Sequence, residues 1–259
     1  MDYALLMAED LRWLGLDWDL GWPEDPGYAQ GRRTVLYEEA FAELSGRGLI
    51  YKCWCSRAER LASSAPHPGE EHPGSCRCRY LSGDELTARL NGKRPPAYKV
   101  AVPDEYVTII DGHLGEYTQN LAHEGGDFIV RRSDGVFAYQ LAVSVDDALM
   151  GVTRVVRAED LLSSAPRQRW LIETLGHTAP DYAHAPLLTA PDGRKLSKRD
   201  GDLNMEELRK RYSPAELTGR LAYLCGLIDR IEPVMPCELV AHFDWAKVPC
   251  GAIDITGVF

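Results

Sequence analysis

The sequence has no apolar run long enough to cross a membrane and no excess of positive charge. None of its 259 residues lies in a stretch close to the roughly 18 uncharged apolar residues that a membrane span requires, so we expect no membrane segment. Acidic residues outnumber basic ones by 39 to 29, and the formal charge is −10. This balance excludes a protein that binds nucleic acid over its whole surface, so any contact with RNA must be local.

The chain also shows no secretory leader and no internal repeat. Its first residues, MDYALLMAEDLRWLG, have the spacing of an amphipathic helix instead of the basic and apolar pattern of a signal peptide. We therefore expect a cytoplasmic protein, and we expect it to act as a monomer. At 259 residues it can form one large domain or two modest ones.

Apolar spacing and capping signals predict the helices. Ser82 and Glu85 form a capping box, and Ser213 and Glu216 form another with a proline in the first turn. Ser163 or Ser164 caps a third segment, which stops at a glycine. Helices are expected at 3–14, 34–46, 82–91, 163–176, 204–212 and from 213 onward.

β-branched and aromatic residues dominate the middle of the chain and predict strands there. A turn signal at Ser133, Asp134 and Gly135 separates two of these segments. In the second half, strands alternate with helices. Strands are expected at 97–102, 105–110, 127–132, 136–145, 152–156 and 182–189.

Cysteine is clustered. Four of the seven cysteines form two C-x-C pairs, at Cys53, Cys55, Cys76 and Cys78. The residues between the pairs lack a hydrophobic period and include His67 and His72, so a bound metal would give this segment the order that packing cannot. Four soft ligands favour structural zinc, and the alternative is four reduced thiols without a ligand.

A basic loop, GRKLSKRDGDLN, occupies residues 193–204. Lys195 and Lys198 are compact charges suited to a phosphate leaving group, and Ser197 can donate one hydrogen bond. Glycines at both ends would let the loop open and close. Spacing alone favours the alternative, an ordinary solvated turn.

Longer stretches resemble class I aminoacyl-tRNA synthetases. KLSKR resembles their lysine signature loop, and FAYQLAVSVDDALMGVTRVVRAEDLLSSAPRQRWLIETLG, followed by YAHAPLL, resembles the second half of the glutamyl-type catalytic domain. KCWC and HPGSC resemble the zinc insertion of the glutamyl-queuosine tRNA(Asp) synthetases, a family paralogous to glutamyl-tRNA synthetase that lacks its anticodon-binding domain. The resemblance implies an α/β fold: an incomplete Rossmann-type catalytic domain with a zinc-binding insertion and a short helical C-terminal part.

This resemblance also implies a division of the chain into four parts. They are the remainder of the first half of the catalytic domain, the zinc insertion with its connecting strands, the second half of the catalytic domain with the lysine loop, and a short helical segment without an anticodon-binding domain. Their expected bounds are 1–52, 53–130, 131–200 and 201–259.

The resemblance assigns roles to residues at matching positions. It implies that Tyr139 and Arg157 contact L-glutamate, and that Lys195, Ser197 and Lys198 contact ATP, with both lysines catalytic and Mg²⁺ accompanying the nucleotide. A guanidinium suits a carboxylate, and a phenol can donate to the same ligand. The alternative is that Tyr139 is a buried strand aromatic and Arg157 a surface ion-pair partner.

For zinc, the resemblance implies the ligands Cys53, Cys55, His72 and Cys76. His72 stands where the family usually has a tyrosine, and imidazole is the better zinc ligand of the two. Cys78 is a spare thiol that could replace His72. Both ligand sets remain open at this point.

The implied reaction is activation of glutamate by ATP and its transfer to queuosine in the anticodon of tRNA(Asp). The chain has neither a His-x-Gly-His motif nor the acidic IEDLD-like strand that the family carries, so we expect an incomplete and impaired version of an active enzyme. A chain completed by another fragment and a degenerate protein are the competing explanations. Two alternative functions are a fragment of glutamyl-tRNA synthetase and an inactive, zinc-stabilised RNA-binding module.

Overall fold

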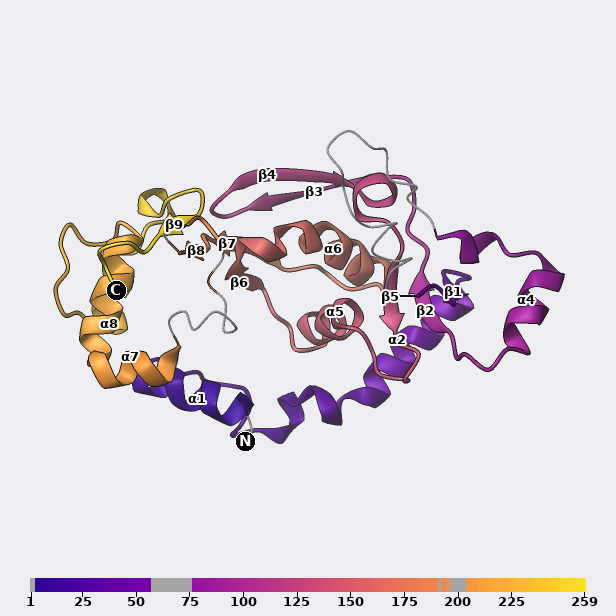
Figure 1. Ribbon diagram of the computed structural model, residues 1–259, viewed down its shortest axis with the longest axis horizontal. Helices are drawn as coiled ribbons and strands as arrows, with labels where there is room; N and C mark the ends of the chain where they lie inside the picture. Colours follow the sequence, from indigo (N-terminus) through magenta and orange to yellow (C-terminus); the bar gives the residue numbers. More distant parts are fainter. Residues whose placement is uncertain (1–2, 57–75, 191, 195, 197–203) are drawn as a thin grey trace.

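The computed structural model describes residues 3–56, 76–190, 192–194, 196 and 204–259. The molecule is elongated, with helix α4 (Gly83–Leu90) near one end and helix α8 (Pro214–Leu224) with the C-terminal segment near the other (Figure 1). Two sheets and the helices between them lie in the middle. Within the described residues, no helix is long and apolar enough to cross a membrane.

The larger sheet has four strands in the order β4-β3-β7-β6. Strands β6 (Arg154–Ala158) and β7 (Asp181–Ala185) are parallel and are joined through helix α6 (Ala165–Thr174), which makes a β-α-β unit. Strand β3 (Tyr106–Asp111) extends the sheet in parallel beside β7 and forms an antiparallel pair with β4 (Gly115–Asn120). This unit confirms the expected α/β class.

The smaller sheet is antiparallel. Its order is β1-β2-β5, with β1 at Ile50–Cys53, β2 at Ala97–Val100 and β5 at Phe128–Arg131. β1 and β2 pair from Ile50 opposite Val100 to Cys53 opposite Ala97. The sheet therefore places the first C-x-C pair at the end of a paired strand.

The main core fills the space between the smaller sheet and three helices. Helix α2 (Thr34–Gly46) and helix α5 (Tyr139–Leu149) pack with α6 beside this sheet. Aliphatic and aromatic side chains from all of these elements interlock there, and the fully buried ones are Leu44, Val100, Val130, Leu141 and Leu171. The core therefore joins the two halves of the chain.

The last part of the chain is mixed. It contains α7 (Met205–Arg211), α8, α9 (Pro236–Leu239) and β9 (Ile253–Asp254). β9 pairs in parallel with β8 (Leu188–Thr189), the strand that leads toward the lysine loop. Helix α1 (Tyr3–Trp13) lies beside α7, where Arg209 contacts Asp10 at 2.8 Å.

Several elements match the sequence predictions. Both capping boxes are present, at Ser82 with Glu85 and at Ser213 with Glu216.

Short 3-10 or π turns complete the described chain; they are η1 (Pro26–Tyr28), η2 (Gln30–Arg32), η3 (Arg77–Tyr80), η4 (Leu121–Gly125), η5 (Glu159–Ser164), η7 (Val240–His242) and η8 (Trp245–Lys247). The division into four parts stays a prediction.

The expected strand at 136–145 is wrong, because α5 begins at Tyr139 and takes up the rest of that range. Leu141 and Val145 are both buried and are spaced as i and i+4, so one helical face meets the core, whereas β propensity favoured a strand. β4 was not predicted, because it is polar and is stabilised by pairing with β3 over six residue pairs.

Candidate active site

Arg157, from β6, is held by three acceptors. Its Nε donates to His184 Nε2 at 3.0 Å, Nη1 to Gln168 Oε1 at 2.7 Å, and Nη2 to the Leu161 carbonyl at 3.2 Å. Its guanidinium lies over the Tyr182 ring, 5.3 Å from the ring centroid. These bonds use three of the five N–H groups of an arginine, so two can serve a ligand.

His184, which accepts from Arg157, is in turn hydrogen-bonded to Asp111. His184 Nδ1 is 2.6 Å from Asp111 Oδ2, and both side chains are fully buried. Asp111 Oδ1 accepts the backbone N–H groups of His113, Leu114 and His184. Although burial raises the pKa of Asp111, hydrogen bonds from the His184 side chain and from these N–H groups hold it below its usual value.

A second chain of hydrogen bonds joins Arg157 to α5. Gln168 Oε1 accepts from Arg157, so its Nε2 donates to Gln140 Oε1 at 2.8 Å. Gln140 Nε2 then donates to Ser164 Oγ at 3.0 Å. Ser164 directly precedes α6, but its hydroxyl serves Gln140, and no side-chain cap bond forms at that helix.

Tyr139 is the first residue of α5, directly before Gln140. Its side chain is 49% exposed, so the alternative that it is a buried strand aromatic is wrong. The alternative that Arg157 is a surface ion-pair partner is also wrong. Its guanidinium donates to His184 and Gln168, which are both fully buried.

Asp147, on α5, is a half-buried residue near Arg157, and no sequence pattern singled it out. Its Oδ2 has no hydrogen-bond partner within the described part of the chain. Its pKa is raised to about 6: burial is the largest cause, Arg157 acts to lower the pKa, and neighbouring Asp146 adds to the rise. Asp146 itself accepts hydrogen bonds from Gln30, Arg33 and Tyr37, which connect α5 to the start of α2 and the residues before it.

The lysine loop lies almost entirely outside the described residues, and so do Lys195, Ser197 and Lys198. Its entrance is described: Gly193, at φ +78°, donates its N–H to Ala190 O at 2.8 Å, and Leu196 N lies 3.4 Å from Leu188 O. This turn follows β8, whose neighbour is β9. The structure therefore places the start of the loop next to the C-terminal segment.

The four clustered cysteines come together. Their sulfur atoms lie within 4.8 Å of one another; the closest pairs are Cys55 with Cys76 at 3.3 Å, and Cys53 with Cys76 and Cys55 with Cys78 at 3.7 Å. Four thiolates at about 2.3 Å from one zinc ion stand about 3.8 Å apart. The donor set therefore fits a tetrahedral metal, and His72 lies outside the described residues.

The thiols differ in acidity. Burial raises the pKa of Cys53 to about 11 and also raises that of Cys55. Burial acts in the same direction on Cys76, but hydrogen bonds from the Cys78 backbone and from the Cys55 and Cys53 thiols lower its pKa overall. A metal would replace the protons that burial otherwise keeps on Cys53 and Cys55.

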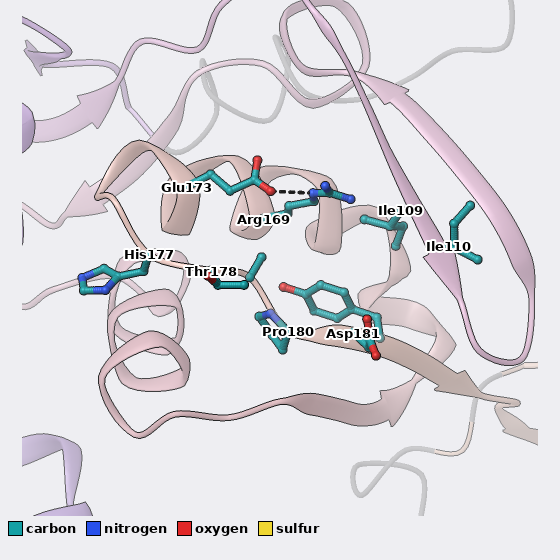
Figure 2. Close-up of a pocket in the computed structure, with 10 residues that line it drawn as sticks. Ile109, Ile110, Arg169, Glu173, His177, Thr178, Pro180 and Asp181 are labelled. Carbon is teal, nitrogen blue, oxygen red and sulfur yellow. Dashed lines mark hydrogen bonds and ion pairs between the residues drawn. The ribbon is translucent and has the colours of Figure 1, made fainter.

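A cavity of about 380 Å³ lies at the other end of β7 (Figure 2). Asp181 and Tyr182, at the amino end of the strand, line it, together with the Arg169–Glu173 ion pair of α6. In parallel α/β sheets, ligands bind outside the carboxyl ends of the strands, which is where Arg157 and His184 lie opposite each other. This cavity is therefore not the candidate substrate site.

Comparison with protein families agrees with this geometry. The model of the catalytic domain of class I tRNA synthetases of the E and Q type matches residues 1–235. The chain belongs to this family. In this class I synthetase, Arg157 lies on β6, at the edge of the four-stranded sheet, within the residues that the catalytic-domain model matches.

Similar curated proteins are named glutamyl-Q tRNA(Asp) synthetase. The one from Symbiobacterium thermophilum is 47% identical over 250 residues, covering 93% of this synthetase and 76% of the relative. That from Nitratidesulfovibrio vulgaris is 43% identical, covering 96% and 78%. The chain thus spans about three quarters of the length of these relatives.

Solved structures of related synthetases have the same fold. A glutamate tRNA ligase from Elizabethkingia meningosepticum, determined in complex with its amino acid, is 25% identical with a TM-score of 0.76. The match covers 98% of this synthetase but only 57% of the ligase. The synthetase therefore spans little more than half of those chains.

The sequence predicted a role for Arg157 but not the side chains that hold it. Asp111, Gln168 and His184 come from three different elements, β3, α6 and β7. A polar residue within an apolar stretch, such as the histidine in YAHAPLL, could have indicated them. Such a residue is expected to be buried, and a buried polar side chain needs a hydrogen-bond partner.

Proposed function

We propose that this synthetase activates L-glutamate with ATP and transfers it to queuosine in the anticodon of tRNA(Asp). In the first step a glutamate carboxylate oxygen bonds to the α-phosphorus of ATP, and pyrophosphate leaves. In the second step a hydroxyl of the queuosine ring attacks the carbonyl carbon of the adenylate, which releases AMP and a proton. Mg²⁺ accompanies ATP as its counterion.

The observation that carries this proposal is the fixed guanidinium of Arg157 at the carboxyl end of β6, in a chain 47% identical to a glutamyl-Q tRNA(Asp) synthetase. Arg157 binds a carboxylate of glutamate through its two remaining N–H groups, and Tyr139 donates to the same ligand. Its position is set before substrate arrives, so little conformational entropy is lost on binding.

Lys195, Ser197 and Lys198 contact ATP, with the two lysines compensating the charge that grows on the leaving pyrophosphate. The described entrance of their loop supports this role, because β8 and the turn at Gly193 direct the chain back past Leu188. Catalysis here depends on positioning and charge compensation, and no protein nucleophile is required.

Zinc is the metal that suits the cysteine group, with Cys53, Cys55, Cys76 and Cys78 as ligands in the geometry described. His72 remains the alternative fourth ligand. A closed set of four ligands leaves no position for water, so the ion orders this segment and takes no part in the chemistry.

The tRNA contact is local, and the segment after the cysteines suits it. Between residues 76 and 99 there are six basic residues and two acidic ones, in a chain whose formal charge is −10. Arg77 is 89% exposed in its side chain there. A local excess of basic residues can contact phosphates on an otherwise acidic protein.

The test of activation is glutamate-dependent exchange between ATP and pyrophosphate. We expect exchange in the wild type and a loss of about a hundredfold or more in Arg157→Gln, which removes the charge that binds the carboxylate. Arg157→Lys is the matched control; it keeps the charge without the two-point geometry and should lose less.

Transfer is tested with two RNAs, because the solved glutamate tRNA ligases favour a second candidate, charging of tRNA(Glu). We expect glutamate on queuosine-containing tRNA(Asp) and none on tRNA(Glu). The opposite result would support the second candidate. If exchange is absent, repeating it on a form extended at the N-terminus by a His-x-Gly-His segment separates an incomplete enzyme from an inactive RNA-binding module; no exchange in either form would contradict the proposed function.

A further inference from the structure

The acceptor that holds Arg157 Nε is a histidine whose own proton is directed by a second buried side chain. An arginine Nε can only donate, so His184 Nε2, at 3.0 Å, must be unprotonated. The remaining ring nitrogen, Nδ1, then carries the proton and donates it to Asp111 Oδ2 at 2.6 Å. The order Asp111, His184, Arg157 is therefore a directed series of hydrogen bonds.

Asp111 is itself fixed. Its Oδ1 accepts three backbone N–H groups, at 2.9 to 3.1 Å, so the carboxylate cannot rotate without breaking them. The other oxygen, Oδ2, contacts the His184 ring. Neither side chain has any exposed surface, so water cannot substitute for a lost bond.

We propose that Asp111 and His184 are positioning residues for glutamate recognition: Asp111 keeps the proton of His184 on Nδ1, and His184 Nε2 thereby orients the Arg157 guanidinium toward the substrate carboxylate. This inference rests on the proposed function, in which Arg157 binds that carboxylate. Neither residue touches substrate; both act through Arg157.

Asp111→Asn changes the direction of the series with almost no change in shape. The amide oxygen keeps the three backbone N–H groups, so the amide nitrogen replaces Oδ2 and donates to His184 Nδ1. The histidine proton then moves to Nε2 and faces the Arg157 N–H. Two donors cannot bond, so the guanidinium loses its orientation.

Two substitutions at His184 separate the contacts of its ring. The oxygen of a glutamine amide lies near the position of Nε2, so His184→Gln keeps an acceptor for Arg157. An asparagine amide lies near the position of Nδ1, so His184→Asn keeps the contact with Asp111 and loses the one with Arg157. The pair is matched in charge and polarity.

The experiment measures KM for glutamate and KM for ATP in pyrophosphate exchange. We expect Asp111→Asn and His184→Asn to raise KM for glutamate about tenfold or more, the effect of one unmade charge-assisted hydrogen bond, with KM for ATP unchanged. His184→Gln should stay within about threefold of wild type. The double variant Asp111→Asn with His184→Gln should recover, because a glutamine oxygen accepts whatever occupies position 111.

Recovery in the double variant distinguishes positioning from a merely structural role, which predicts additive damage. Additive damage, or equal increases in both KM values, would overturn the inference. A second readout is independent of activity: ¹⁵N NMR should find the His184 proton on Nδ1 in the wild type and on Nε2 in Asp111→Asn. A wild-type proton on Nε2 overturns the inference, whereas absence of exchange in an N-terminally extended wild type contradicts the proposed function.

Discussion

Helices α4 and α6 illustrate two ways in which this synthetase stabilises a site. α4, which follows the cysteine group, has no buried residue among its eight. α6, which supplies Gln168 to the arginine network, buries six of its ten residues. In the proposed zinc site, ligand bonds would stabilise a thinly packed segment, whereas the arginine network depends on a dense core. Loss of metal and loss of packing should therefore damage different parts of the molecule.

Removing a cysteine ligand should have the largest effect. We expect Cys76→Ser to lose zinc, whose binding contributes on the order of 10 kcal/mol of apparent free energy in small structural sites. Amide hydrogen exchange should then increase in residues 50–56 and 76–90, with β6 and β7 unchanged. Cys237→Ser, at an exposed cysteine outside the group, is the control and should retain the metal. Increased exchange across both sheets would mean that the two regions are not independent.

Truncating a core leucine tests how far α6 depends on its packing. Leu171, on α6, is fully buried, so Leu171→Ala should lower the free energy of unfolding by about 2–5 kcal/mol. Leu90, on α4, is 48% exposed, and Leu90→Ala should change it by about 0.5 kcal/mol or less. Urea denaturation measures both. Similar losses at the two positions would contradict the contrast between the helices.

The fourth metal ligand can be assigned by a matched pair. Because the Cys78 sulfur lies 3.7 Å from that of Cys55, we expect Cys78→Ser to weaken zinc affinity by about a hundredfold or more, beyond the range for outer-sphere partners. His72→Ala should leave it unchanged. Competition with a chelator gives the affinities. The reverse result would assign His72 to the site.

A smaller, pH-dependent effect is expected at Asp147. Its folded-state pKa of about 6 lies above its usual value of 3.8, so the folded form binds the proton more tightly. Stability falls as pH rises between these two values, and the penalty is complete above about 6. Asp147→Asn removes the cost of ionising this side chain in the folded protein. It should stabilise the protein at pH 7 by about 1 kcal/mol after allowance for solvent screening.

Denaturation at pH 4 and pH 7 checks this prediction, and the gain should be much smaller at the lower pH. Asp181→Asn, at an exposed carboxylate of β7, is the control and should change stability by less than about 0.5 kcal/mol at both values. An equal gain from Asp147→Asn at both pH values would show that ionisation is not the cause.

Local signals in the sequence predicted the parts of the fold that local chemistry determines. The Ser82 and Ser213 capping boxes are examples, because each is complete within four residues. β4 was missed and α5 was mistaken for a strand, because their states depend on a partner strand and on a core. The two sites differ in the same way: one is determined by residues close in sequence, and the other by residues far apart.

The cysteine group was visible in the sequence because each C-x-C pair is short; the sequence left Cys78 as an alternative to His72, and the structure brings the Cys78 sulfur to the other three. The arginine network was not visible beyond Arg157. Asp111 and His184 are 73 positions apart, and only the parallel pairing of β3, β7 and β6 brings them to one arginine. No spacing rule encodes such a contact.

The pairing of β8 with β9 affects the order in which the protein can be completed during synthesis. Thr189 and Ile253, which contact each other there, are 64 positions apart. At translation rates of about 5–20 residues per second, β8 waits several seconds or more for its partner. The strand that precedes the lysine loop thus acquires this neighbour only after 64 further residues have been synthesised.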